Sequence, residues 1–220
     1  MGKTAFAVNI AEHCSLSNQG SVAIFSMEMP AEQLVTRMIS STGEISINQI
    51  RSGQFDGRDH YKFQEALNKL LPSRIFIDET AGLSALDIRA KVRRFKRLNP
   101  DLSLVIVDYI QLMSGFGKNS NNRVTELGEI SRSLKALAKE INIPIIVLSQ
   151  LSRSVETRQD KRPIMSDLRD SGAIEQDADI IIFMYRAGYY SREEGEKEPV
   201  NDPAEAIIRK HRNCLLYTSP

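Results

Sequence analysis

The sequence has few cysteines and no apolar run long enough to cross a membrane. Cys14 and Cys214 lie far apart and form no C-x-x-C pair, which argues against both a disulfide framework and a zinc site. No stretch approaches the roughly 18 uninterrupted apolar residues of a membrane span. The start also lacks the basic-then-apolar order of a signal peptide. We therefore expect a protein of the reducing cytoplasm that is neither exported nor membrane-spanning.

The sequence also lacks an excess of charge of either sign. Lys and Arg number 29 and Asp and Glu number 28, which gives a formal net charge of +1 over 220 residues. Such a chain has no general attraction to polyanions, so any contact with nucleic acid must come from particular loops. With 41% hydrophobic residues and no internal repeat, the length fits one α/β domain that buries a core.

Short apolar runs alternate along the chain with longer segments of helical periodicity. Because the runs are continuously apolar rather than alternating, they predict a mostly parallel sheet that is buried on both faces and flanked by helices on both sides. The expected strands are Val22–Ser26, Ile75–Asp78, Leu104–Asp108, Ile145–Ser149, Ile180–Tyr185 and Ala206–Arg209. The expected helices are Thr4–His13, Pro30–Ser41, Arg58–Leu70, Ser84–Leu98 with Ser84 and Asp87 as a capping pair, and Val124–Ile141.

The first residues, "MGKT", match the end of a phosphate-binding loop. Gly2, Lys3 and Thr4 correspond to the last three letters of G-x-x-x-x-G-K-[ST], whose first glycine and preceding strand would lie upstream of Met1. A helix N-terminus with free amides and a lysine binds phosphate, and Thr4 would offer a hydroxyl to Mg²⁺. The alternative is a helix that starts with glycine and lysine by chance, as in roughly one chain in ten.

Three polar residues stand at or near the ends of expected strands. Asp108 ends "LVIVD", the pattern of an aspartate that holds Mg²⁺ through water, although such a residue is often only a turn residue. Glu28 in "FSMEM" has apolar neighbours, which suits a general base in a dry setting; the alternative is a helix-start glutamate. Gln150 could sense the γ-phosphate, or simply cap a buried strand.

Two polar segments interrupt the alternation of strands and helices. Gly115–Asn122 is rich in glycine and asparagine, and Leu151–Gln176 carries several basic residues, Arg158 and Arg169 among them. Loops that leave the carboxyl ends of parallel strands build the functional face of such a sheet, so both segments lie where a ligand would bind. The alternative is that both are solvated surface loops.

An ordered set of motifs resembles the C-terminal RecA-like motor domain of replicative DNA helicases of the DnaB family. The resemblance covers Met1 to Asn213, and its most specific part is the long "DLRDSGAIEQDAD" stretch. The motifs are GKT, "FSMEM", "LVIVDYIQLM", "PIIVLSQLSR", "DLRDSGAIEQDADIIIFMYR" and "IIRKHRN". The resemblance implies a RecA-like P-loop NTPase fold and an ATP-driven helicase that moves on single-stranded DNA as a homo-hexameric ring. It also implies primase and loader partners for the full-length protein.

The resemblance assigns roles to residues around one ATP and Mg²⁺ site. Gly2, Lys3 and Thr4 bind phosphate, and Thr4 binds the metal. Glu28 is the catalytic base. Asp108 holds Mg²⁺ through water, and Gln150 couples hydrolysis to movement.

Five further residues match positions that act away from the chain's own ATP site. Arg169, Asp170 and Gly172 match the loop that grips the single-strand backbone. Lys210 and Arg212 match the pair that reaches into the neighbouring subunit's ATP site, Arg212 as the arginine finger. The alternatives are surface positions without a function: Arg169 could pair with Asp167 or Asp170 on a solvated surface, and Arg212 could be an ordinary surface arginine.

The sequence departs from the family pattern at both ends. The glycine-rich start of the phosphate loop, its strand and the family's N-terminal domain are absent, and "CLLYTSP" at 214–220 does not resemble the family. We therefore predict a truncated motor domain over residues 1–213 that is inactive alone. Two alternatives are a RecA- or RadA-like recombinase ATPase and a non-catalytic fragment of the helicase.

Overall fold

The computed structural model describes residues 2–17, 20–115, 123–190 and 203–214, with the side chains of 169–171 left out. Its first half contains α1 Lys3–Leu16, β1 Ser21–Ser26, α2 Ala31–Gly43, α3 Ile47–Ser52, α4 Gly57–Leu70, β2 Ile75–Asp78, α5 Ala85–Leu98 and β3 Leu102–Asp108. The second half contains η1 Ile110–Leu112, α6 Arg123–Ile141, β4 Ile145–Val147, α7 Ser154–Thr157, η2 Met165–Ser171, α8 Gly172–Asp177, β5 Ile180–Arg186, α9 Ala187–Tyr190 and β6 Ala204–His211.

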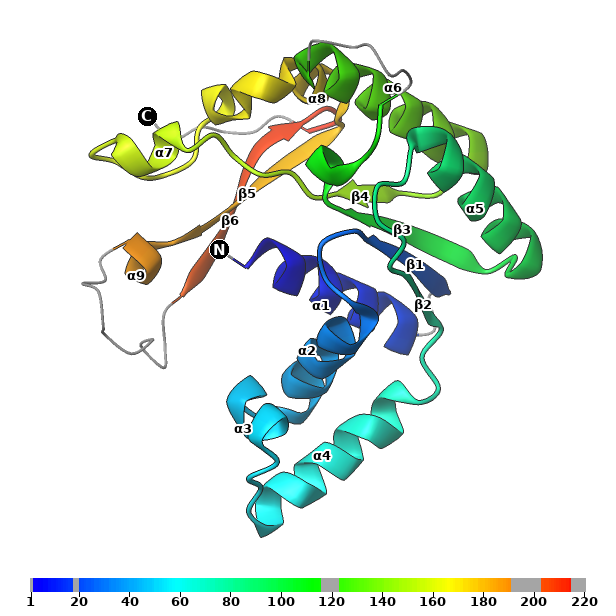
Figure 1. Cartoon of the computed structure of the whole chain (residues 1–220), viewed down its shortest axis with the longest axis vertical. Helices are drawn as coiled ribbons and strands as arrows, with labels where there is room; N and C mark the ends of the chain where they lie inside the picture. The colour runs from blue at the N-terminus through cyan, green and yellow to red at the C-terminus, as the bar shows by residue number, and fades with distance from the viewer. Residues whose placement is uncertain (1, 18–19, 116–122, 191–202, 215–220) are drawn as a thin grey trace.

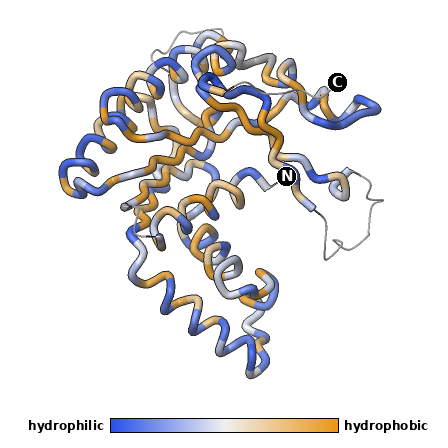
Figure 2. Tube along the Cα trace, turned by 180° about the vertical axis from the view of Figure 1, so that it is seen from behind, coloured by the Kyte–Doolittle hydropathy of each residue, from blue (hydrophilic) through white to orange (hydrophobic). Residues whose placement is uncertain are grey.

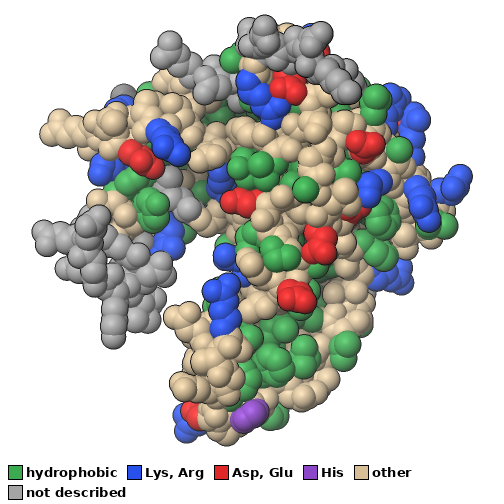
Figure 3. Space-filling model, in the orientation of Figure 1, with side chains coloured by type: hydrophobic (Ala, Val, Ile, Leu, Met, Phe, Trp, Pro, Cys, Tyr) green, Lys and Arg blue, Asp and Glu red, His purple; other side chains and the backbone are tan. Residues whose placement is uncertain are grey.

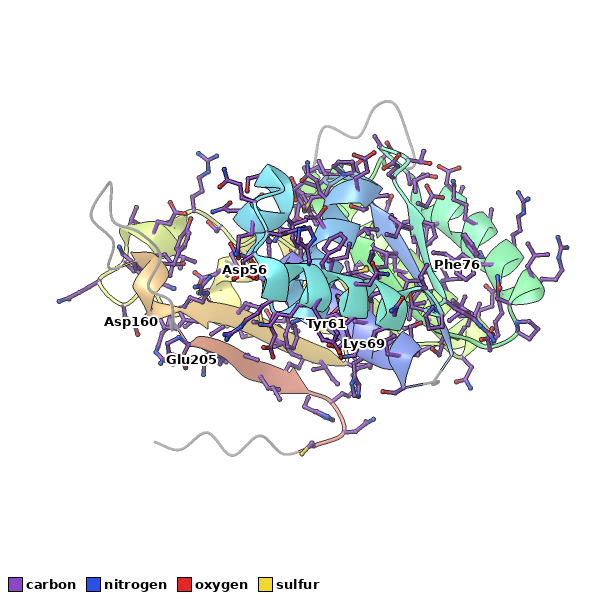
Figure 4. The ribbon with its side chains drawn as sticks, turned by 90° about the horizontal axis from the view of Figure 1, so that it is seen from below. Asp56, Tyr61, Lys69, Phe76, Asp160 and Glu205 are labelled. Atoms are coloured by element: carbon purple, nitrogen blue, oxygen red, sulfur yellow. The ribbon has the colours of Figure 1, made fainter. Side chains whose placement is uncertain are left out.

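Four strands form a parallel sheet in the order β2-β1-β3-β4, as the apolar runs predict. Helices cover both faces, with α5 and α6 on one side and α1 and α2 on the other (Figure 1). In the view from below, α4 runs across the molecule from Asp56 past Tyr61 and Lys69 toward Phe76 on β2 (Figure 4). The expected α/β class with a helix-flanked parallel sheet is confirmed.

The two central strands, β1 and β3, send alternate side chains into two hydrophobic cores. Ala23 and Phe25 pack under α5 and α6, whereas Val22 and Ile24 pack against α1 and α2. All six residues of β1 are buried, which explains its continuously apolar sequence. Apolar colour is accordingly concentrated along the central strands in Figure 2.

The last two strands differ from the prediction. Among the described residues β5 and β6 form a separate antiparallel pair, and one face of that pair is open to solvent. Ile180, Ile182 and Ile208 are 49%, 40% and 48% exposed, while Ile181 and Phe183 are buried against Leu168. The expectation of burial on both faces is therefore wrong here. An apolar run shows that a strand could be buried, but it does not show whether another element packs on each of its faces.

The expected helices are present, and their ends follow local capping chemistry. Ser84 and Asp87 form the predicted capping box of α5: the Asp87 amide donates to Ser84 Oγ at 3.1 Å and the Ser84 amide to Asp87 Oδ2 at 2.9 Å. Pro30 is the residue just before α2. Nearly all of the polar segment 115–122 lies outside the described residues. No helix in the described part of the chain is long and apolar enough to span a membrane.

Candidate functional site

A pocket of about 320 Å³ lies where α1 begins, at the carboxyl ends of β1, β3 and β4. In the space-filling view the molecule is hollowed on this side, with basic and acidic side chains at the rim (Figure 3). The pocket therefore brings together all the residues that the sequence predicts for one nucleotide site, and it adds four more. Its lining is Gly2, Lys3, Thr4, Ala5, Glu28, Met29, Arg37, Asp108, Tyr109 and Gln150.

The start of α1 offers backbone amides to this pocket. Gly2 has φ +83°, a left-handed conformation that glycine adopts without strain, and it precedes Lys3, the first residue of the helix. No side chain among the described residues caps this end of the helix. Since the first amides of a helix have no partner within it, they can bind an anion, and the helix dipole favours negative charge there.

Thr4 and Asp108 bring two oxygen ligands together at the pocket floor. The Thr4 hydroxyl donates to Asp108 Oδ2 at 2.9 Å, and Asp108 is only 3% exposed. Burial raises the pKa of Asp108, and the charge of Glu28 raises it further, whereas the Thr4 hydrogen bond, Lys3 and Arg37 lower it. A cation bound here would stabilise the ionised carboxylate.

The pair fits Mg²⁺ better than a metal held wholly by protein. Mg²⁺ takes hard oxygen ligands and usually keeps several waters, with one or two protein groups plus substrate phosphates. Among the described residues there is no cluster of three or more His, Cys, Asp or Glu that could hold a metal. Two oxygens beside a phosphate-binding helix end match the sparse set that Mg²⁺ uses.

Lys3 crosses the pocket toward the end of β4. Its Nζ donates to the carbonyl of Ser149 at 2.9 Å and lies 6.0 Å from the centre of the Tyr109 ring. Burial lowers the pKa of Lys3, and the charges of Asp108 and Glu28 oppose that shift. The ammonium is thus held beside the acidic groups of the pocket.

Gln150 is positioned by Gln111, a residue that sequence reasoning missed. The backbone amide of Gln150 donates to Gln111 Oε1 at 3.2 Å. Gln111 Nε2 in turn donates to Ser149 Oγ at 2.9 Å and to the backbone carbonyl of Gln150 at 3.2 Å. The one sequence signal for Gln111 is a polar residue inside the apolar "YIQLM". Arg37 and Tyr109 were also missed, and nothing in their spacing marks them as pocket residues.

Glu28 reaches the pocket but not in the expected surroundings. It is exposed, in a bend two residues after the end of β1, so the expectation of a dry setting is wrong for this structure. The Ser26 hydroxyl donates to the Met29 carbonyl at 2.6 Å, which turns the chain there. Met27 is buried and Met29 half-buried, but they do not enclose the carboxylate between them.

Lys210 and Arg212 do not line this pocket; they lie against the end of α8. Lys210 Nζ donates to the Glu175 carbonyl at 2.5 Å, and Arg212 Nη2 donates to the Gln176 carbonyl at 2.8 Å. Arg212 also lies 3.4 Å from a carboxylate oxygen of Asp179. The two cations therefore bind the carboxyl end of a short helix, where the dipole favours positive charge.

The remaining predicted residues belong to the segment just before and at the start of α8. Gly172 is the first residue of α8, and Arg169 and Asp170 lie in η2. The side chains of Arg169 and Asp170 lie outside the described residues. The structure therefore places this loop next to the helix whose carbonyls bind Lys210 and Arg212.

Comparison with known protein families and sequences gives consistent matches. The family described as "DnaB-like helicase C terminal domain" matches residues 1–219. The chain is 49% identical over 218 residues to the replicative DNA helicase DnaB of Geobacillus stearothermophilus, covering 99% of this chain and 47% of that protein. It is 49% identical over 218 residues to the replicative DNA helicase DnaC of Bacillus subtilis (strain 168), with the same coverage. The chain thus spans about half the length of these curated relatives.

Solved structures agree with the fold. One that is described as an ATPase domain superposes with a TM-score of 0.87 at 42% identity, covering 97% of this chain and 74% of that chain. A DnaB-like replicative helicase, studied for its interactions with primase, gives a TM-score of 0.87 at 42% identity, covering 97% and 50%. The RecA-like α/β fold expected from the sequence is therefore confirmed.

Proposed function

The chain belongs to the DnaB-like helicase C-terminal domain family, and from this premise we propose that it is the ATP-driven motor of a replicative DNA helicase. The motor moves on single-stranded DNA as a hexameric ring and unwinds duplex at the replication fork. The observation that carries the proposal is the pocket in which Gly2, Lys3, Thr4, Asp108 and the exposed Glu28 meet. The family match favours this function over a RecA- or RadA-like recombinase.

The proposed binding chemistry follows from the groups at the start of α1. The first amides of α1 and the Lys3 ammonium hold the phosphates of ATP. Thr4 Oγ1 and Asp108, the latter through water, would hold a magnesium ion, which would offset the negative charge that the phosphates develop. The Thr4–Asp108 hydrogen bond of 2.9 Å keeps the two oxygens close enough to serve one ion.

Hydrolysis needs a base within the pocket and a cation from outside it. Glu28 accepts a proton from the attacking water, and Gln150 responds to the loss of the γ-phosphate. Lys210 and Arg212 lie against α8 rather than at their own chain's pocket. That position supports their action in a neighbouring subunit, and an arginine supplied in this way raises phosphoryl-transfer rates by about 10³–10⁵.

DNA contact is proposed for Arg169, Asp170 and Gly172. Backbone contacts without base readout let a motor move along any sequence. The formal charge of +1 agrees with binding through a local loop rather than through the field of the whole protein. We further propose cytoplasmic function with primase and a helicase loader as partners, in line with the primase complex of the DnaB-like structural relative.

The test of the motor proposal is an unwinding assay on forked DNA with the complete protein. We expect ATP- and Mg²⁺-dependent strand separation by the wild type and none by Lys3→Ala, with Lys69→Ala as a control because Lys69 is an exposed lysine of α4 paired with Glu65. Filaments with strand exchange would support the recombinase alternative. Wild-type protein that neither unwinds DNA nor hydrolyses ATP would overturn the proposal.

The fragment alternative has its own test. Residues 1–220 are titrated with a fluorescent ATP analogue and Mg²⁺, beside a version extended upstream through a complete G-x-x-x-x-G-K-T loop and its strand. We expect micromolar binding only in the extended version, because the upstream loop supplies the amides that enclose the β-phosphate. Micromolar binding with hydrolysis by residues 1–220 would contradict the prediction that this part of the protein is inactive alone.

A further inference from the structure

An ion pair joins Arg158, the residue after α7, to the buried Asp167 in η2. Arg158 Nη1 donates to Asp167 Oδ1 at 3.0 Å and Arg158 Nη2 donates to Asp167 Oδ2 at 2.8 Å. Asp167 is only 3% exposed, and the Arg158 side chain is 30% exposed. Two parallel bonds between a guanidinium and a carboxylate fix both distance and orientation. We name this pair the 158–167 clasp.

Backbone groups complete the clasp. The Ile164 amide donates to Asp167 Oδ2 at 2.8 Å, and Arg158 Nη2 also donates to the Arg162 carbonyl at 2.9 Å. The clasp therefore closes the loop from 158 to 167 on itself. Loss of Arg158 would leave a buried carboxylate without its counter-charge, which is far more costly than loss of an exposed pair.

Along the chain, the clasp lies between Gln150 of the nucleotide pocket and the segment proposed to grip DNA. Gln150 lines the pocket, and two residues later the Ser152 amide donates to the Asp167 carbonyl at 3.0 Å. Arg169 follows Asp167 by two residues. One backbone hydrogen bond thus joins the segment after β4, which carries Gln150, to η2, which carries Arg169.

Apolar contacts also join the segment after β4 to η2. Leu151 and Met165 pack with the buried Leu168 against Ile181 and Phe183 of β5. By contrast, the chain from 153 to 164 buries only the side chains of a valine and a proline, at 155 and 163, so it has little packing of its own. The clasp therefore orders a loop with few apolar contacts of its own, next to the hydrogen bond between the 152 amide and the 167 carbonyl.

We propose that Arg158 and Asp167 are positioning residues that couple the nucleotide pocket to the DNA-gripping segment. The inference rests on the proposed function, because it gives a task to contacts between two proposed binding regions. With the clasp closed, residues 150–168 move as one body, so a shift of Gln150 also shifts η2. With the clasp open, each region keeps its own groups but no longer responds to the other.

Coupling of this kind is reciprocal, which makes it measurable by binding alone. If ATP raises the affinity for single-stranded DNA by some factor, DNA raises the affinity for ATP by the same factor. We therefore measure the affinity of the complete protein for an oligo-dT strand with and without a non-hydrolysable ATP analogue. The wild type should show a ratio of at least about 5-fold, the lower end of typical allosteric coupling.

Arg158→Ala should bring this ratio to about 1 while leaving analogue binding in the absence of DNA unchanged. Arg158→Lys keeps the charge but loses the two-pronged bond, so it should restore less than half of the wild-type ratio. Arg162→Ala is the matched control. It removes an equal charge from the same segment, where Arg162 pairs with Glu205 at 2.6 Å and its backbone amide donates to Asp160, and it should keep the ratio. Figure 4 labels these two acidic partners, Asp160 and Glu205.

Two results would overturn the inference. Arg158→Ala could keep the wild-type ratio; if it does so while weakening DNA binding equally with and without the analogue, Arg158 is a direct phosphate contact. Alternatively, Arg162→Ala could lose the ratio as completely as Arg158→Ala.

A ligand-free measurement separates failure of this inference from failure of the proposed function. In hydrogen–deuterium exchange, Arg158→Ala should speed exchange in peptides that cover 160–168, where the Ile164 amide loses its ordered acceptor, and Arg162→Ala should not. Unchanged exchange overturns the clasp whatever the protein does. If exchange is faster in Arg158→Ala but the wild type binds neither ATP nor DNA, the clasp stands and the proposed function is overturned.

Discussion

Asp108 illustrates how single residues of the pocket depend on one another. Burial favours its protonated form, and Thr4, Lys3 and Arg37 favour the ionised form. The charge of Glu28 also raises the pKa of Asp108, so the two carboxylates repel each other and only Thr4, Lys3 and Arg37 oppose this effect. Such a site is electrostatically prepared for a divalent cation, and its acidic groups oppose the lowering of the Lys3 pKa by burial.

At the residue scale, Glu28→Gln tests the assignment of the general base. The change should leave ATP binding intact and lower turnover by about 100-fold or more, because it removes the base but not the phosphate-binding groups. The measurements are equilibrium binding of an ATP analogue and steady-state hydrolysis. Glu32→Gln, at an exposed position of α2 outside the pocket, is the control. Near-normal turnover of Glu28→Gln would assign the base elsewhere.

Arg169→Ala tests the proposed DNA contact. We expect weaker binding to single strands by a similar factor for every sequence, with a salt dependence reduced by about one counterion, because a phosphate contact releases ions but reads no base. Basal hydrolysis should continue while its stimulation by DNA falls. Affinities measured at several salt concentrations check this. If affinity and salt slope both stay at wild-type values, the DNA path lies away from Arg169.

At the element scale, periodicity predicts what is local and misses what depends on distant partners. The parallel strands and the capping box at Ser84 follow from nearby residues, so the sequence suffices for them. The open face of β5 and β6 and the exposure of Glu28 depend on what lies across from them, which a pattern does not state. Arg37 reaches the pocket, and Gln111 contacts Gln150, only through the fold. No spacing marks Arg37, and the one signal for Gln111 is a polar residue inside an apolar run.

Glu12 makes the packing of α1 on α2 sensitive to pH. It is 6% exposed, its Oε1 has no hydrogen-bond partner among the described residues, and burial raises its pKa from 4.5 to about 7, with Ser41 opposing. Since the folded state holds the proton more tightly than the unfolded state, this carboxyl costs no stability below pH 4.5. The cost grows as pH rises toward about 7, and above that it is constant.

Glu12→Gln should therefore stabilise the protein at pH 8 by about 1–3 kcal/mol and have little effect near pH 4.5. Urea unfolding at both pH values gives the two free energies of unfolding. Glu129→Gln, at an exposed position of α6, should change neither. An equal effect of Glu12→Gln at both pH values would show that packing rather than ionisation is responsible.

At the scale of the whole molecule, the proposed catalytic groups fall into two sets that one chain does not bring together. Lys3 and Glu28 line the pocket, whereas Lys210 and Arg212 bind the carbonyls at the end of α8. A ring in which each interface joins one set from each of two subunits would complete every site and make hydrolysis depend on assembly.

Mixed rings test this arrangement directly. Lys3→Ala inactivates the subunit's own pocket but keeps the arginine finger, whereas Arg212→Ala keeps the pocket but removes the arginine finger. Each variant alone should therefore hydrolyse ATP at least about 1,000-fold more slowly than wild type. When the two are co-expressed in equal amounts, half of the pockets are intact and half of those face an intact finger. Random assembly should then recover about a quarter of wild-type turnover per subunit. Arg209→Ala, at an exposed neighbouring position on β6, should keep full activity. Two differently tagged variants that co-purify but stay inactive together would show that Arg212 acts on its own chain's site.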